Sequence, residues 1–258
     1  MADLRNYQAR VAAGSRADAA IDEGLRAYML KVYNLMALGL AITGFAALGT
    51  MMLATTNDPS LAAATLGNGK MLTSLGVALY GSPLKWVVML APLGMVFFLS
   101  ARIQAMSVSG AQIAFWVFAG LMGLSLSSIF LVYTAQSITQ TFFITAAAFG
   151  ALSLFGYTTK RDLTGMGTFL FMGVIGLLIA MVVNIFLASP ALQFAISAIG
   201  VLVFSGLTAY DTQKIKEMYW EGDDTLVAGR KAIMGALTLY LDFINLFTFL
   251  LSFLGNRE

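Results

Sequence analysis

The stretch that decides the fold is LYLDFINLF, residues 239–247. Eight of its nine residues suit or tolerate the apolar interior of a lipid bilayer, and the fourth, Asp242, does not. A charged side chain at the bilayer centre costs about 2.5–3.5 kcal/mol on insertion scales. An ionisable residue at that depth is therefore a candidate functional residue, and Asp242 is one such candidate in this sequence.

The composition of the chain indicates an integral membrane protein. Of its 258 residues, 59% are hydrophobic and 11% are charged, whereas a soluble globular domain carries about 25% charged residues. So few charges cannot cover a water-facing surface, and a net charge of +2 gives no indication of a nucleic-acid partner. Because the chain has no Cys and no His, any response to pH must come from carboxylates or amines.

Seven apolar runs are long enough to cross the hydrocarbon core, which takes about 20 helical residues. Residues 1–26 have no long apolar core and are expected to form a cytoplasmic N-terminal tail, with 27–258 as one seven-helix transmembrane domain. The stretch Met71–Gly81 is too short for an eighth span and is expected to be interfacial or re-entrant. The expected spans lie near residues 28–54, 84–103, 112–134, 138–158, 165–188, 190–213 and 230–254.

The distribution of Lys and Arg predicts the orientation, since both are enriched on the cytoplasmic side of a membrane. With the N-terminus in the cytoplasm, twelve of the 15 basic residues fall inside, and Lys70, Lys85 and Arg257 fall outside. This alternation requires an odd number of spans and therefore supports seven. The absence of a cleaved signal or a sorting motif is compatible with a bacterial inner membrane.

Two of the thirteen acidic residues, Asp211 and Asp242, fall at membrane depth. Other polar residues share their helical faces: Thr238 and Asn245 with Asp242, and Thr208 with Asp211. A polar face on a helix in lipid should turn toward protein or water, because lipid offers no hydrogen bonds. We therefore expect the last helix to be interior, with its polar face toward the sixth and the two carboxyl groups adjacent.

Two adjacent carboxyl groups in a dry interior cannot both ionise cheaply, so the pair is expected to titrate as a unit and to act as a proton sensor. Carboxylate oxygens also suit Ca²⁺, but a tight calcium site takes about six to eight oxygens. We therefore expect Asp211 and Asp242 to make weak, transient contact with Ca²⁺ as a permeant ion, with no resident cofactor. Arg102, at the cytoplasmic end of the second span, is either a topology anchor or an ion-pair latch that holds the path shut.

Three segments carry a family resemblance. VFSGLTAYDTQKIKEMY (203–219) and LYLDFINLFTFLLSFLG (239–255) resemble the most characteristic segments of the Bax inhibitor family, and GLSLSSIFLVYT (123–134) is similar to its third-span motif. The resemblance, to a bacterial member, covers the chain after the tail and implies six helices surrounding a central seventh. It also implies a pH-sensitive calcium leak, with Asp211 and Asp242 as the sensing pair. Arg102 matches the latch of some bacterial relatives, although the loop after it differs in length.

Three functions remain open at this point, all of them in a lipid bilayer. The first is a calcium or cation leak channel gated by the di-aspartate proton sensor. The second, implied by some bacterial relatives, is an interaction protein whose tail modulates a membrane-anchored quality-control protease. The third is a proton-coupled transporter that uses the same acids as a relay. An enzyme is not expected, since the sequence has no visible nucleophile–base pair or catalytic metal set.

Overall fold

The computed structural model describes residues 2–256, with side chains described from Glu23 to Asn256. In this part of the chain, seven helices are long and apolar enough to cross a membrane, and each of their ends lies within five residues of the predicted one. The protein is therefore an all-α integral membrane protein, as its sequence predicts. The seven helical spans are Glu23–Ala54, Leu84–Ala105, Val108–Val132, Ala135–Thr158, Thr164–Leu187, Pro190–Glu217 and Thr225–Leu254.

The helices begin where the sequence supplies capping groups. The side chains of Ser107, Thr134, Ser189 and Asp224 each accept a hydrogen bond from a backbone N–H in the first turn of the helix that follows, which satisfies a donor that the helix itself cannot pair. The elements are α1 (Ala2–Ala54), α3 (Leu84–Arg102), η3 (Ile103–Ala105), α4 (Val108–Leu126), α5 (Ile129–Val132), α6 (Ala135–Thr158), α7 (Thr164–Leu187), α8 (Pro190–Glu217) and α9 (Thr225–Leu254).

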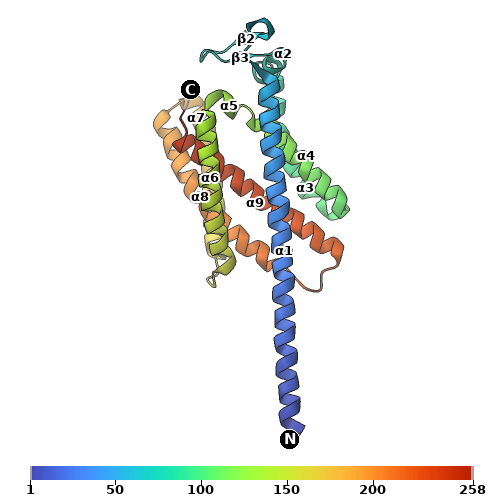
Figure 1. Cartoon of the computed structure of the whole chain (residues 1–258). Coiled ribbons are helices and arrows are strands. Elements are labelled where there is room, and N and C mark those ends of the chain that lie inside the picture. The colour runs from blue at the N-terminus through green and yellow to red at the C-terminus, as the bar shows by residue number, and fades with distance from the viewer. Residues whose placement is uncertain (1, 257–258) are drawn as a thin grey trace.

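Helix α1 extends well beyond the bundle at its N-terminal end (Figure 1). The predicted boundary between tail and transmembrane domain, at residue 26, falls within this continuous helix. The side chains of residues 1–22, which make up most of the predicted tail, lie outside the described residues.

The connection between α1 and α3 contains a small antiparallel sheet that the sequence analysis did not predict. Its strands are β1 (Thr55–Thr56), β2 (Ala64–Thr65) and β3 (Met71–Leu72), in the order β1-β3-β2. The short turns η1 (Pro59–Leu61), α2 (Ser74–Gly76) and η2 (Val77–Gly81) complete the connection. The stretch Met71–Gly81 thus consists of a strand and two short helical turns and does not span the membrane, as expected.

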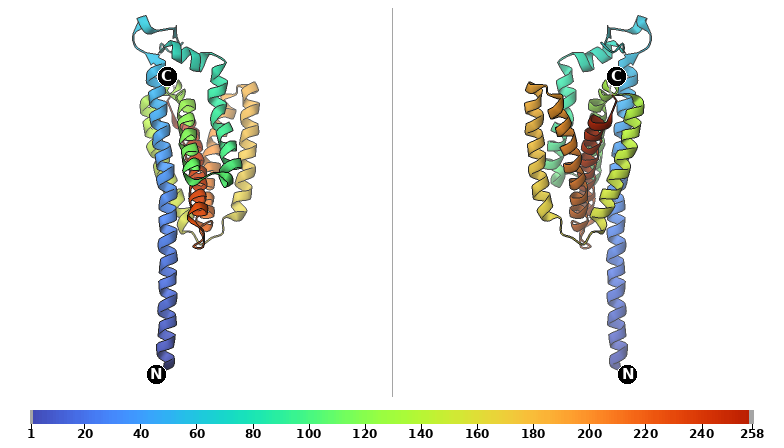
Figure 2. Two further views of the ribbon diagram at one scale, coloured as in Figure 1. Left: turned by 90° about the vertical axis from the view of Figure 1, so that its right-hand side faces the viewer. Right: turned by 90° about the vertical axis from the view of Figure 1, so that its left-hand side faces the viewer.

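Helix α9 is the central element of the bundle (Figures 1 and 2). In its most apolar 18-residue window, 56% of the residues are buried, against at most 33% for the corresponding windows of the other spans. It packs against α1, α4, α6 and α8, while α3 packs mainly on α4 and α7 mainly on α8. The seventh span is therefore central, with four helices in close contact and two at the periphery.

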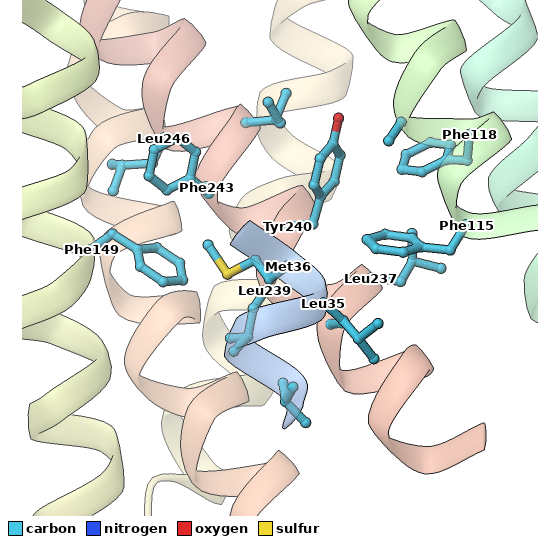
Figure 3. Packing of buried hydrophobic residues seen from close by; sticks show 14 of the residues in the cluster. Leu35, Met36, Phe115, Phe118, Phe149, Leu237, Leu239, Tyr240, Phe243 and Leu246 are labelled. Carbon is cyan, nitrogen blue, oxygen red and sulfur yellow. The ribbon is translucent and has the colours of Figure 1, made fainter. Parts of the chain in front are cut away.

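On its apolar side, α9 packs against α1, α4 and α6 through one cluster of buried side chains (Figure 3). At its centre, the Tyr240 ring is fully buried and meets Phe115 and Phe118 of α4 edge-on, with ring centroids 5.8 and 5.3 Å away. The Tyr240 hydroxyl and the Thr43 hydroxyl of α1 are hydrogen bonded at 2.5 Å. This face of α9 packs against other helices, and the polar residues of α9 lie on the opposite face.

Close helix contacts depend on glycine at a few positions. At Gly156 of α6, a Cβ atom would overlap the backbone carbonyl group of Ala209 in α8. At Gly150 of the same helix, a Cβ atom would meet nothing within 4 Å. Small residues at helix interfaces permit this approach in membranes, so the α6–α8 contact depends on the first glycine and not on the second.

We expect Gly156→Ala to lower the free energy of unfolding in detergent by about 1–3 kcal/mol, because α6 and α8 must move apart to admit the methyl group. Gly150→Ala, on the same helix, should leave it almost unchanged. The measurement is thermal or denaturant unfolding of the two purified variants. Equal effects of the two substitutions would contradict this account of the contact.

Candidate functional site

The two membrane-depth acids meet in one cavity of about 560 Å³. Asp211 enters it from α8 and Asp242 from α9, and their carboxyl groups lie within hydrogen-bond reach of each other. Asp242 is 4% exposed, and Asp211 is partly buried. The cavity is lined by Gly167, Thr168, Phe171, Val174, Phe204, Leu207, Tyr210, Asp211, Lys214, Thr238, Leu241, Asp242 and Asn245, from helices α7, α8 and α9.

The connection between α8 and α9, residues 218–224, brings the two acids to one level. Lys231 in the second turn of α9 forms an ion pair with Asp223 at 2.5 Å and donates to the Met218 carbonyl oxygen at 3.0 Å. Asp224 caps α9 by accepting a hydrogen bond from the Val227 N–H at 2.7 Å. These contacts fix the turn, so that α9 returns antiparallel along α8, its most extensive helix contact.

A hydrogen bond between the two carboxyl groups would require a proton. An ionised carboxylate has no donor, so two carboxyl groups can bond to each other only if one of them is protonated. Among the described residues, the buried Oδ2 of Asp242 has no hydrogen-bond partner, although buried polar atoms are normally paired. The geometry therefore accommodates one proton between the two carboxyl groups and leaves the buried Oδ2 atom of Asp242 unpaired.

Of the predicted supporting residues, two lie in this cavity and one does not. Thr238 and Asn245 flank Asp242 on α9 and line the cavity, and the Asn245 side-chain amide donates to the Leu241 carbonyl oxygen at 2.8 Å. Thr208 is fully buried outside the lining, and its hydroxyl donates to the Phe204 carbonyl oxygen of its own helix at 2.8 Å. A helical threonine is often satisfied in this way, and Thr208 supports the packing of α8.

The residues next to Asp211 have structural contacts that the sequence analysis missed. The Thr212 hydroxyl donates to the Thr208 carbonyl oxygen at 2.7 Å and is hydrogen bonded to Ser153 of α6 at 2.9 Å. Ser153 is in turn bonded to the Tyr33 hydroxyl of α1 at 2.6 Å. This chain of hydroxyls joins α1, α6 and α8. Hydroxyl residues within three apolar runs are a sequence signal for such a network, but the sequence gives no pairing.

Gln213 anchors the connection between α6 and α7. Its side-chain oxygen accepts a hydrogen bond from the Leu163 N–H at 2.9 Å, and its side-chain nitrogen donates to the Arg161 carbonyl oxygen at 2.8 Å. A glutamine can make both bonds at once because it carries a donor and an acceptor. Within the YDTQ segment, the aspartate and the tyrosine thus line the cavity, while the threonine and the glutamine hold neighbouring helices.

The basic residue at the cavity is Lys214 and not Arg102. Lys214 lies one turn after Asp211, and its Nζ atom is 5.7 Å from the centre of the Tyr210 ring. Arg102, at the end of α3, has an exposed side chain that forms no ion pair or hydrogen bond with any described residue. The predicted latch is therefore not engaged with the pair in this structure. Lys214 lies one residue beyond the predicted sixth span (190–213), among the twelve basic residues that the sequence places on the cytoplasmic side.

The pair alone does not form a tight metal site. Among the described side chains, no group of three or more His, Cys, Asp or Glu residues could hold a metal ion. Two carboxyl groups supply far fewer than the about six to eight oxygens of a tight calcium site. Any cation at this cavity would keep much of its water shell.

We expect Gln213→Leu to loosen the α6–α7 connection without removing either acid, because two hydrogen bonds are lost. Amide hydrogen exchange at Leu163 should accelerate by about tenfold or more, and the free energy of unfolding should fall by about 1–3 kcal/mol. Gln140→Leu, at an exposed position of α6, is the control and should change neither quantity. Unchanged exchange in the Gln213 variant would show that its side chain does not hold the connection.

Comparison with known proteins identifies one family and several similar bacterial proteins. A family described as "Inhibitor of apoptosis-promoting Bax1" matches residues 25–258. Uncharacterized protein RP147 of Rickettsia prowazekii is 50% identical over 237 residues, which cover 92% of this chain and 92% of that protein. Inner membrane protein YbhL of Escherichia coli is 47% identical over 237 residues, covering 91% and 94%. A Caulobacter vibrioides protein is 47% identical over 261 residues, covering both chains completely.

Proposed function

The chain belongs to the Bax inhibitor family, and from that premise we propose that it is a pH-sensitive calcium or cation leak channel. The observation that supports the proposal most strongly is the contact between the Asp211 and Asp242 carboxyl groups in one cavity of the bundle. A shared proton would make this pair the sensor, and its oxygens would be a point of cation contact on the path.

The depth of the pair supports a transmembrane path. Asp242 lies twelve residues before Leu254, the last residue of α9, which corresponds to about 18 Å of helix. Ionisable residues at such depth are costly and line ion pathways or proton relays in many membrane proteins. A cation that reaches this pair from the Leu254 end of α9 has therefore crossed about 18 Å of the bundle.

Loss of the shared proton would change both charge and packing. With the proton, the two acids are hydrogen bonded and hold α8 against α9. Without it, two negative charges repel each other and attract a cation, so the two protonation states favour different arrangements of the helices. Ca²⁺ and the proton would then compete for the same oxygens, and cation contact would increase as the pH rises.

The name of the Escherichia coli relative, an inner membrane protein, supports a bacterial inner membrane as the location of this chain. With the predicted orientation, the α8–α9 connection and Lys214 face the cytoplasm, and the α7–α8 turn faces outward. A transporter would differ from this channel in showing saturable counterflow of a solute. An interaction protein would co-purify with a protease and show no flux in liposomes.

We expect Ca²⁺ flux through the purified protein in liposomes to depend on pH between about pH 5 and 8, and Asp242→Asn to lower it by about tenfold or more with loss of the pH dependence. The reason is that a neutral amide neither shares the proton nor offsets the desolvation of the ion. Glu221→Gln, at an exposed position in the α8–α9 connection, is the matched control and should behave as the parent chain. Unchanged rate and pH profile in the Asp242 variant would refute the sensor assignment.

A further inference from the structure

A second polar pocket, of about 390 Å³, lies at the α7–α8 turn beside the C-terminal end of α9. Its walls include Asn184, Ser189, Gln193 and Ser252. The Asn184 amide donates to Gln193 at 3.1 Å, and the Gln193 amide donates to the Ser252 hydroxyl at 3.3 Å. The pocket is thus lined by neutral amide and hydroxyl groups, which can replace part of the water shell of a cation.

The pocket and the aspartate cavity are lined by the same three helices, α7, α8 and α9. Ser252 in the pocket and Asn245 in the cavity are on one face of α9, two turns apart, which corresponds to about 10 Å of helix. On α8, Gln193 lies in the pocket and Phe204 in the cavity. Helix α7 contributes to both walls. The two spaces therefore follow each other along α8 and α9. The side chains between them decide whether an ion can pass from one to the other.

Two aromatic rings occupy the interval. Phe249 of α9 lies between Asn245 and Ser252 in the sequence, and its ring stacks on Phe204 of α8, with centroids 5.6 Å apart and planes 26° from parallel. Gly200 of α8 makes room for this arrangement, since a Cβ atom there would lie 2.5 Å from the Phe249 ring. The Phe204 side chain is 9% exposed. The Phe249 side chain is partly buried, and the two rings lie between α8 and α9 at the level that separates pocket from cavity.

We propose that the pocket is the outer vestibule for the permeating cation and that the Phe204–Phe249 stack is the apolar barrier between it and the aspartate pair. A hydrophobic constriction excludes ions because water leaves it. In the structure described here the barrier is closed, so the outer route to Asp242 opens when the rings separate. This inference rests on the proposed channel function, and its test is chosen to give a result that does not depend on Ca²⁺ flux.

The test uses cysteine labelling, for which a chain without cysteine is suited as it stands. Single variants Ser252→Cys and Asn245→Cys are exposed in sealed vesicles to a membrane-impermeant methanethiosulfonate that carries a quaternary ammonium group. The side from which Ser252→Cys reacts defines the outer side. From that side, Asn245→Cys should react more slowly by about tenfold or more, because the barrier excludes a charged reagent. Equal rates at the two positions would overturn the proposal.

Removal of either ring should open the route. Adding Phe249→Ala or Phe204→Ala to the Asn245→Cys chain is expected to raise its labelling rate from the outer side by about tenfold. Phe247→Ala is the matched control, since this ring is buried on another side of α9, against Phe142, and should leave the rate unchanged. No increase with either ring variant, or an equal increase with the control, would overturn the barrier.

The labelling result separates this inference from the channel function. If the labelling shows no barrier but Ca²⁺ flux still depends on Asp242, the channel function stands and the two rings do not lie on the path of the ion. A barrier to labelling in a chain without Ca²⁺ flux would instead refute the channel function, and with it the role of the pocket as a cation vestibule.

Discussion

Contact between two carboxyl groups at membrane depth constrains how α8 and α9 pack against each other. Neither Asp211 nor Asp242 can face lipid without a large cost in free energy, and each must find a partner inside the protein. Because the partner of each is the other acid, α8 and α9 must stay adjacent at this level. A proton shared by the pair, as proposed above, would therefore stabilise the fold as well as serve as a signal.

Helix α9 has an apolar face and a polar face. One side carries apolar and aromatic residues that pack on α1, α4 and α6, with Tyr240 at the centre. The other side carries Thr238, Asp242, Asn245 and Ser252, which line the two cavities beside α7 and α8. The first side fixes the position of the helix in the bundle. The second side faces the two cavities, and Phe249 interrupts it between them.

Much of this arrangement could be predicted from the sequence, for two physical reasons. The length of an apolar run fixes whether a helix spans the membrane, which gave all seven spans. The cost of burying charge singled out Asp211 and Asp242, and helical spacing placed Thr238 and Asn245 beside them. Each of these rules acts on a single segment and needs no knowledge of the neighbours.

What depends on contacts between segments could not be predicted in the same way. The strands of the small sheet between α1 and α3 have two residues each, too few to show a periodic pattern. Arg102 and Lys214 are both basic residues near helix ends, and only the three-dimensional arrangement places Lys214 at the cavity. Thr208 shares a helical face with Asp211, yet its hydroxyl is satisfied within its own helix. The stack of Phe204 on Phe249 joins two helices and has no signature in either one.

The shared proton is the central claim, and infrared spectroscopy of the purified protein tests it most directly. A carboxyl group that carries a proton has a C=O stretching band distinct from that of a carboxylate, and the band moves on transfer to deuterated water. We expect such a band from the protonated carboxyl group of the Asp211–Asp242 pair. It should disappear in Asp242→Asn and weaken when Ca²⁺ is added. A spectrum without this band at any pH at which the protein is folded, or a band that persists unchanged in Asp211→Asn and in Asp242→Asn, would contradict it.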